Sequence, residues 1–175
     1  MHLRFLGTGA ADWQQPEPSG EFRRNASMLV DGALLMDGNA TILDMLPTPS
    51  GVEDMFFTHS HDDHFSAEAI RAIAPKRVYA HESWAAGIDA GGAEVVPLRV
   101  SVPVTTPSGF SILPLPANHA TETPSETALH YLIERDGQRL LYATDGAWLL
   151  NRARRLIGGL RLDAAVFDAT IGDIV

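Results

Sequence analysis

The sequence predicts a single α+β domain, residues 1–175, built mainly from short strands. The chain has 175 residues, of which 45% are hydrophobic and 20% are charged, the composition of one globular domain with a substantial core. Short apolar runs recur along it and are separated by turn residues, and few segments are long enough for a helix. Asp31-Gly32 and Asp136-Gly137 each join two such runs, which is a strong hairpin signal.

The expected elements follow from these runs in chain order. A first strand at 3–6 precedes Gly7-Thr8-Gly9, whose glycines permit either a plain tight turn or a close backbone approach to a ligand. Proline, glycine and polar residues favour a loop over 12–25. Further strands are expected at 26–30, 33–36, 55–57, 77–80, 94–98, 101–105, 110–115, 128–134, 139–143 and 163–167. Helices are expected at 41–46, 66–74 and 147–156.

Positions 59–64 hold three histidines and two aspartates directly after an apolar strand. His59 and His61 are two apart, so both point to the same side of an extended chain. Asp63 and His64 follow at the turn before a helix. Imidazole and carboxylate together are ligands of zinc, manganese and iron(II). A lone histidine here would be structural, but four fixed positions in the pattern His-x-His-x-Asp-His predict half of a two-metal site.

Two later strands also finish at a candidate ligand. The run at 110–115 leads to His119, and the run at 139–143 leads to Asp145. Taken alone, His119 is a loop histidine and Asp145 is a turn residue before glycine. Because strand ends at one edge of a sheet converge, the motif at 59–64 favours the metal-binding interpretation for both. His81 has no neighbouring ligand in the sequence and is expected to be structural.

Composition limits the classes of partner. The net charge of −9 disfavours a general nucleic-acid surface. The chain has no cysteine, so a metal would be held by histidine and carboxylate. Neither a signal segment nor a run of 18 apolar residues is visible, so a cytoplasmic protein without a membrane partner is expected. The basic cluster of Arg152, Arg154, Arg155 and Arg161 is expected to be a solvated helix face.

The motif at 59–64, with His119 and Thr144-Asp145-Gly146 downstream, resembles the metallo-β-lactamase superfamily. The resemblance covers essentially the whole chain and implies an α+β four-layer αββα sandwich with its active site at one edge. The opening residues 5–10 resemble the branch that contains tRNase Z and the phosphoribosyl cyclic phosphodiesterase. Residues 23–27 and 113–119 resemble the cyclic phosphodiesterase more closely.

The resemblance also implies ligands and roles. It places one metal on His59, His61 and His119 and a second on Asp63 and His64, with Asp145 bridging both. The cofactors would be two divalent ions, zinc or manganese, with iron also suitable, and they would activate the attacking water. Asp63 would be catalytic as well as metal-binding, because it would handle the proton released during attack.

One departure from the family concerns the second metal. The family normally supplies another histidine near the C-terminus, after one more helix and strand, whereas no histidine follows His130 in this chain. Members of the branch are also usually longer. A natural short form and a truncated chain both account for this. The apolar run at 163–167 is typical of an interior strand, which favours truncation and the loss of the last helix and strand.

The expected function is therefore a metal-dependent hydrolase, specifically a phosphodiesterase acting on a small or cyclic phosphodiester. A nucleic-acid substrate is disfavoured because no basic arm is present and the net charge is −9. Two alternatives stay open: a thioester or lactone hydrolase of the same fold, and a non-catalytic metal-binding domain. The sequence also leaves a homodimer open.

Overall fold

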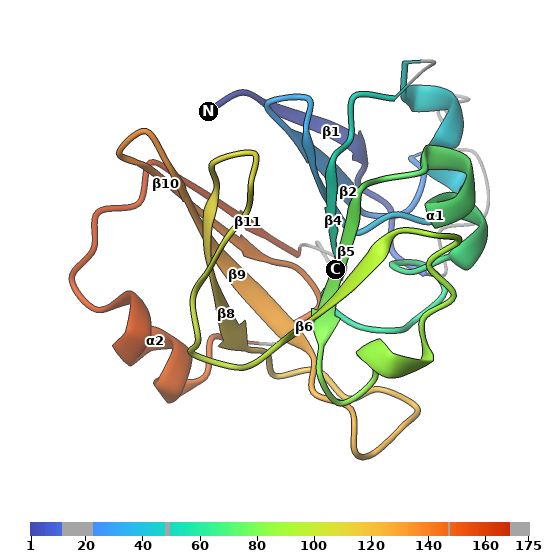
Figure 1. Ribbon diagram of the computed structural model, residues 1–175. Helices are drawn as coiled ribbons and strands as arrows, with labels where there is room; N and C mark the ends of the chain where they lie inside the picture. Colours follow the sequence, from blue (N-terminus) through green and yellow to red (C-terminus); the bar gives the residue numbers. More distant parts are fainter. Residues whose placement is uncertain (12–22, 48–49, 147, 169–175) are drawn as a thin grey trace, which may run out of the picture.

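Two β-sheets face each other in the computed structural model, which describes residues 1–11, 23–47, 50–146 and 148–168 (Figure 1). The first sheet has the order β1–β2–β3–β4–β5–β6, with bounds Leu3–Gly7, Ser27–Val30, Leu34–Met36, Asp54–Phe56, Arg77–His81 and Glu94–Leu98. The second has the order β11–β10–β9–β8–β7, with bounds Ala164–Phe167, Gln138–Ala143, Leu129–Arg135, Ser111–Pro116 and Val104–Thr105. Helices α1 (Ala67–Ile73) and α2 (Asn151–Ile157) flank the pair of sheets on opposite sides (Figure 1).

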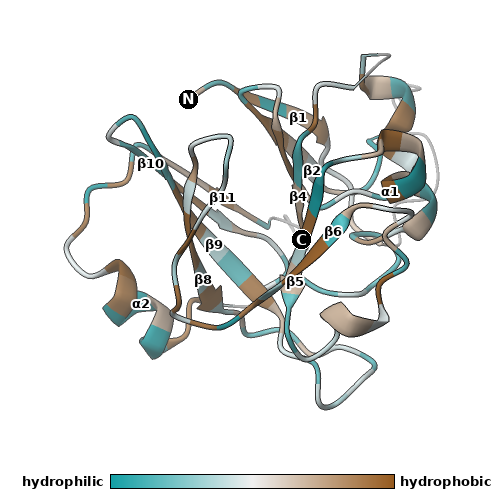
Figure 2. Cartoon of the chain, viewed as in Figure 1, coloured by the Kyte–Doolittle hydropathy of each residue, from teal (hydrophilic) through white to brown (hydrophobic). Residues whose placement is uncertain are grey.

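Alternate residues of the strands pack into different layers. In β2, Met28 belongs to the apolar cluster between the sheets, whereas Leu29 packs with Ile70 of α1. In β10, Tyr142 lies between the sheets, whereas Leu141 packs with residues of α2. Hydrophobic residues therefore run along the strands, and both helices carry hydrophobic and hydrophilic residues (Figure 2). The result is the four-layer αββα sandwich that the resemblance implies.

Both predicted hairpins are confirmed. Strands β2 and β3 pair antiparallel across Asp31 and Gly32, whose φ angles are 48° and 71°. Strands β9 and β10 pair in the same way across Asp136 and Gly137, with φ angles of 50° and 75°. Two consecutive residues with positive φ characterise a type I′ turn, whose twist matches that of the flanking strands.

The strands that follow the first hairpin bring their carboxyl ends to one edge. Strands β3, β4, β5 and β6 run parallel, and Met36 of β3 lies beside Phe56 of β4 in the register. The segments after β3 and β4 therefore leave the sheet side by side. They carry Asp37 and the Thr58–His64 loop, respectively, to the same edge of the sheet.

The helices differ from expectation in type and position. The predicted helix at 41–46 is a 3₁₀ helix, η1 (Ala40–Met45), in which the amides of Ile42 and Leu46 donate to the carbonyls three residues earlier, and Asn39 caps it by accepting from the Thr41 amide. Helix α1 agrees with the prediction, and Ser66 caps it by accepting from the Ala69 amide. The predicted helix at 147–156 begins only at Asn151 and ends at Ile157, and before it the amides of Asp145 and Gly146 donate to the carboxylate of Asp168.

One strand prediction also needs correction, and one agrees with the structure. The strand expected at 101–105 is reduced to β7, because Ser101 has a φ of 68° and the Val102 amide donates to the Arg99 carbonyl in a turn. The apolar run at 163–167 was predicted to leave an exposed sheet edge in a chain without the last strand. Strand β11 pairs parallel with β10, no other described strand pairs with it, and its residues alternate between half-buried and exposed.

Other predictions fall partly outside the described residues. Most of the loop expected at 12–25 does so, as does Ala147, the first residue of the predicted second helix. Within that loop, the backbone carbonyls of Arg23 and Arg24 accept hydrogen bonds from the amides of Thr8 and Gly9, respectively. Among the described residues, no helix has the length and apolar character needed to cross a membrane.

The inter-sheet core predicts a contrast between two leucines. Leu140 is buried between the sheets, whereas Leu160 is 41% exposed in the turn after α2. We expect Leu140→Ala to lower the free energy of unfolding by about 2 to 5 kcal/mol, because it leaves a cavity. Leu160→Ala should lower it by less than about 1 kcal/mol. Urea denaturation monitored by circular dichroism would measure both, and equal losses would contradict the assignment of this core.

Candidate metal centre

Three histidines from two strand ends form the first candidate ligand group. His59 Nε2 lies 3.0 Å from His61 Nδ1, and His119 Nε2 lies 3.2 Å from the same atom. One ligand atom from each of the three lies within 4.8 Å of the others, so the ring nitrogens converge on a common point. Burial and then the neighbouring His64 and His119 lower the pKa of His59 to about 2. A neutral imidazole is the form that binds metals.

A second group adjoins the first and shares His59 with it. Asp63 and His64 complete this group, and Asp63 Oδ2 lies 3.3 Å from His64 Nε2. Asp145 Oδ2 lies 2.8 Å from His64 Nε2 and 3.6 Å from His59 Nε2, so this carboxylate stands between the two groups. Nitrogen and oxygen donors without thiolate suit zinc, manganese and iron(II). The donor set and its spacing thus fit divalent ions.

The chain around the motif turns tightly so that all of its ligands face inward. The amides of His64 and Phe65 both donate to the His61 carbonyl, and α1 begins immediately afterwards. The side-chain amide of Asn39 donates to the Asp63 carbonyl at 3.0 Å. The Gly38 amide donates to the His64 carbonyl at 2.7 Å. The segment after β3 therefore holds the turn between Asp63 and His64 in place.

Asp37 belongs to neither ligand group but orients the imidazole rings of His64 and His59. Its carboxylate is fully buried and accepts from the Thr58 amide at 2.8 Å and from the Thr58 hydroxyl at 3.0 Å. Its Oδ2 lies 2.9 Å from His64 Nδ1 and accepts from the Tyr142 hydroxyl at 3.2 Å. The Thr58 hydroxyl also lies 2.9 Å from His59 Nδ1. One carboxylate thus fixes the ring orientation of His64 directly and that of His59 through Thr58.

The electrostatics of the second group centre on His64. Burial by itself would lower its pKa, but the charge of Asp37 and hydrogen bonds to Asp145, Asp37 and Asp63 raise it well above the ordinary value. Burial opposes ionisation of Asp145, yet His64 lowers the pKa of that carboxyl to about 2. Asp63 likewise has a lowered pKa, because His64 outweighs the effect of burial. The surrounding carboxylates therefore favour the protonated form of His64.

Two further carboxylates hold the loops of the centre. Glu126 accepts from the Ser60 amide at 2.8 Å and from the Ser60 hydroxyl at 2.6 Å, which fastens the segment between His59 and His61. Asp168, at the end of β11, accepts from the Asp145 amide at 2.6 Å. Asp145 has a φ of 51°, and these hydrogen bonds help to keep it in that conformation.

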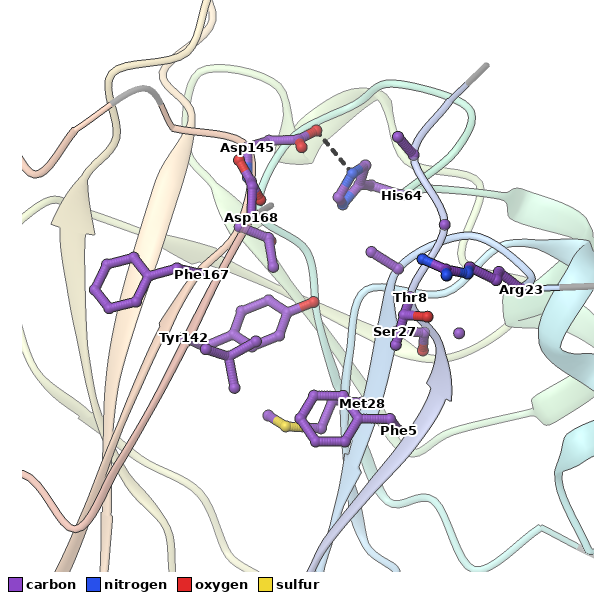
Figure 3. Close-up of a pocket in the computed structure, with 16 residues that line it drawn as sticks. Phe5, Thr8, Arg23, Ser27, Met28, His64, Tyr142, Asp145, Phe167 and Asp168 are labelled. Atoms are coloured by element: carbon purple, nitrogen blue, oxygen red, sulfur yellow. Dashed lines mark hydrogen bonds and ion pairs between the residues drawn. The ribbon is translucent and has the colours of Figure 1, made fainter. Parts of the chain in front are cut away.

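A pocket of about 510 Å³ opens on the side of His64 and Asp145 (Figure 3). Residues of β1 and β2 line one wall and residues of β10 and β11 line the other. The Gly7-Thr8-Gly9 segment contributes to the first wall. A Cβ atom at Gly7 would lie 2.0 Å from the Asn25 carbonyl oxygen, so the glycine permits a close approach of two backbone segments.

The structure brings together all six side chains that the sequence singled out: His59, His61, Asp63, His64, His119 and Asp145. Their binding of metal stays a prediction. Sequence reasoning missed Asp37, Glu126 and Asp168. A signal for Asp37 was present, because it follows an apolar strand that is parallel to the strand before the motif. No local sequence pattern predicts the contacts that Glu126 and Asp168 make. His81 contacts Ser83 and belongs to neither ligand group.

The position of Asp37 predicts that the substitution Asp37→Asn lowers the affinity for zinc. The amide cannot accept from Thr58 and His64 as the carboxylate does, so we expect zinc affinity to fall about 10- to 100-fold. Asp54→Asn is a matched control, since Asp54 is equally buried but lies at the opposite end of β4 and binds Arg77. Isothermal titration calorimetry would measure both. Unchanged zinc affinity in Asp37→Asn would contradict the orienting role.

The raised pKa of His64 predicts proton release on metal binding. An ion on His64 Nε2 would replace the proton that this atom shares with Asp145, whereas His59 is already neutral. We therefore expect about one proton to leave per metal bound to this group near pH 7. Apparent affinity should fall as pH decreases. Calorimetry in buffers of different ionisation enthalpy would measure the release, and buffer-independent heats would contradict this protonation state.

Comparisons with known proteins agree with this fold. The sequence of residues 36–173 matches the family described as the β-lactamase superfamily domain. A comparison with curated protein sequences found no match. Zn²⁺-bound PqqB from Methylobacterium extorquens is similar in structure, with a TM-score of 0.76 and 19% identity over 96% of this chain and 72% of that chain.

Two further solved structures share the architecture. Human tRNase Z, short form, has a TM-score of 0.66 and 17% identity over 93% of this chain and 76% of its own. A diphosphatase from the PhnP family has a TM-score of 0.60 and 20% identity over 93% of this chain and 72% of its own. The family match covers most of the chain, and the neighbours share its αββα layers. The chain therefore belongs to the metallo-β-lactamase superfamily.

Proposed function

We propose that this chain is a metal-dependent hydrolase that cleaves a small or cyclic phosphodiester. The observation that carries the proposal is the position of Asp145, whose Oδ2 lies between His59 Nε2 and His64 Nε2 at 3.6 and 2.8 Å. A carboxylate shared by two adjoining ligand groups is suited to hold two ions. Those ions would supply Lewis-acid activation of the attacking water and of the phosphoryl oxygens.

The residues of the chain would hold the ions, accept a proton and orient the imidazoles. His59, His61 and His119 would hold one ion, and Asp63 and His64 the other, with Asp145 contributing to both. Asp63 is also the candidate proton acceptor, the role that the resemblance implies, and its Oδ2 lies 3.3 Å from His64 Nε2 inside the ligand group. Asp37 and Thr58 would keep the imidazoles oriented throughout.

The substrate class is inferred from charge and from the neighbouring folds. A net charge of −9 is poorly suited to a polynucleotide, so a small substrate is favoured. The structural neighbours include a tRNase Z and a PhnP-family diphosphatase, which supports chemistry at phosphorus. The opening residues 5–10 resemble the same branch. Zinc or manganese are the favoured ions, and iron(II) fits the same donors.

Metal content and phosphodiester hydrolysis test the proposal together. We expect about two ions per chain by elemental analysis and hydrolysis of bis-p-nitrophenyl phosphate. Asp145→Asn should lose at least one ion and lower kcat/KM by about 100-fold or more, because it removes the shared ligand. Asparagine is chosen because it tolerates the φ of 51° at this position. Asp89→Asn, at a surface ion pair with Arg71, should change neither quantity.

Other outcomes separate the alternatives. Two ions with turnover of thioesters or lactones but not phosphodiesters would identify a carbonyl hydrolase of the same fold. Turnover of pre-tRNA without any small phosphodiester would overturn the proposed substrate class. One ion or none, without hydrolysis of any of these substrates, would identify a non-catalytic metal-binding domain.

A further inference from the structure

The pocket beside the candidate metal centre changes character along its length. At one end it is lined by His64 of the second ligand group and by Asp145, whereas His59, His61 and His119 do not line it. Figure 3 shows His64 and Asp145 together at this end and Met28 and Phe5 at the other. A molecule bound here would therefore place one end at the metal centre and the other end against apolar side chains.

The apolar end is part of the inner face of the sandwich. Phe5 of β1 pairs with Met28 of β2 in the register, so both point to the same face of the sheet. Met28 is fully buried, whereas Phe5 is 49% exposed inside this concave wall. Tyr142 and Val166 line the opposite wall, while the Phe167 ring points away from the cavity (Figure 3). An aromatic side chain left half-exposed in a pocket is typical of a ligand site.

The rim carries one arginine, Arg23, as well as the carboxylate of Asp168. Arg23 lines the pocket beside Thr8, and a guanidinium is well suited to phosphate oxygens. The adjacent Arg24 points elsewhere, because its guanidinium binds the carboxylate of Asp44. The pocket therefore joins a guanidinium and a candidate metal centre to an apolar wall. Its volume of about 510 Å³ is within the range that holds a small organic molecule.

From these features, and on the basis of the proposed function, we infer that the substrate is an amphiphilic phosphodiester. Its phosphate would lie at the end of the pocket lined by His64 and Asp145, near Arg23. Its non-leaving ester group would be aromatic or similarly apolar and would pack on Phe5 and Met28. Hydrolysis would consume one water, break the P–O bond to the leaving alcohol and leave the phosphomonoester of the apolar group in the pocket.

Two substrates with the same leaving group test this inference. Phenyl p-nitrophenyl phosphate and methyl p-nitrophenyl phosphate both release p-nitrophenolate and differ only in the group assigned to the pocket. With metal-loaded protein we expect kcat/KM to be at least about tenfold higher for the phenyl ester. Phe5→Ala should reduce this ratio to about twofold or less. Val102→Ala removes an exposed apolar side chain outside the pocket and should leave the ratio unchanged.

The neighbouring arginines provide a second matched pair. Arg23→Ala should lower kcat/KM for both esters by about tenfold without changing their ratio, because the phosphate is common to both. Arg24→Ala should alter neither value. A phenyl preference that persists in Phe5→Ala, or equal rates for the two esters, would overturn the assignment of the pocket while the proposed hydrolysis stands.

A binding measurement decides the inference when neither ester is cleaved, which would count against the proposed function alone. Calorimetry with phenylphosphonate and methylphosphonate then compares the two groups without catalysis. Tighter binding of phenylphosphonate by about tenfold, reduced in Phe5→Ala, would support the apolar pocket. Equal binding of the two phosphonates, or no binding of either, would overturn it.

Discussion

The buried carboxylate of Asp37 is the constraint on which the candidate centre depends. It stands where β3 leaves the first sheet and accepts from Thr58, which follows β4, while its Oδ2 contacts His64. It also accepts from Tyr142 of the second sheet. One side chain thus links both sheets to the ligands at their shared edge. A buried carboxylate without such partners would be strongly unfavourable, so its partners and its position stabilise each other.

The sandwich supplies the rigidity that this network needs. Phe56 of β4 stacks on Tyr79 with ring centroids 4.0 Å apart and meets Tyr131 edge-on. The Tyr131 hydroxyl donates to the Phe57 carbonyl, immediately before the loop that carries the motif. The apolar core therefore continues directly into the polar edge. A site whose supports are packed in this way can hold several ligands close to one geometry.

The two sides of the centre have different surroundings. The three-histidine group is backed by the Glu126 contact to Ser60. His64 and Asp145 line the pocket, whereas the three histidines of the first group do not. The carboxylates of Asp37, Asp145 and Asp63 raise the pKa of His64, and His64 in turn lowers the pKa of Asp63 and Asp145.

The sequence by itself determined the parts of this protein whose signal is local. The hairpins at Asp31-Gly32 and Asp136-Gly137 have turn chemistry that allows few alternatives, and the spacing at 59–64 predicts metal ligands wherever the strand lies. His119 and Asp145 were predicted correctly as neighbours of the motif, because they also follow strands. Their convergence needed only the general tendency of strand ends to meet at one edge.

Only the tertiary structure decided how these parts are held and what adjoins them. Asp37 and Tyr142 are 105 positions apart, and Ser60 and Glu126 are 66 apart, so no local pattern encodes their contacts. The hydrogen bonds of the Asp145 and Gly146 amides to the Asp168 carboxylate likewise span 23 and 22 positions. The pocket exists because β1 and β11 lie at the same side of two facing sheets. Such features depend on long-range packing, which a single sequence does not display residue by residue.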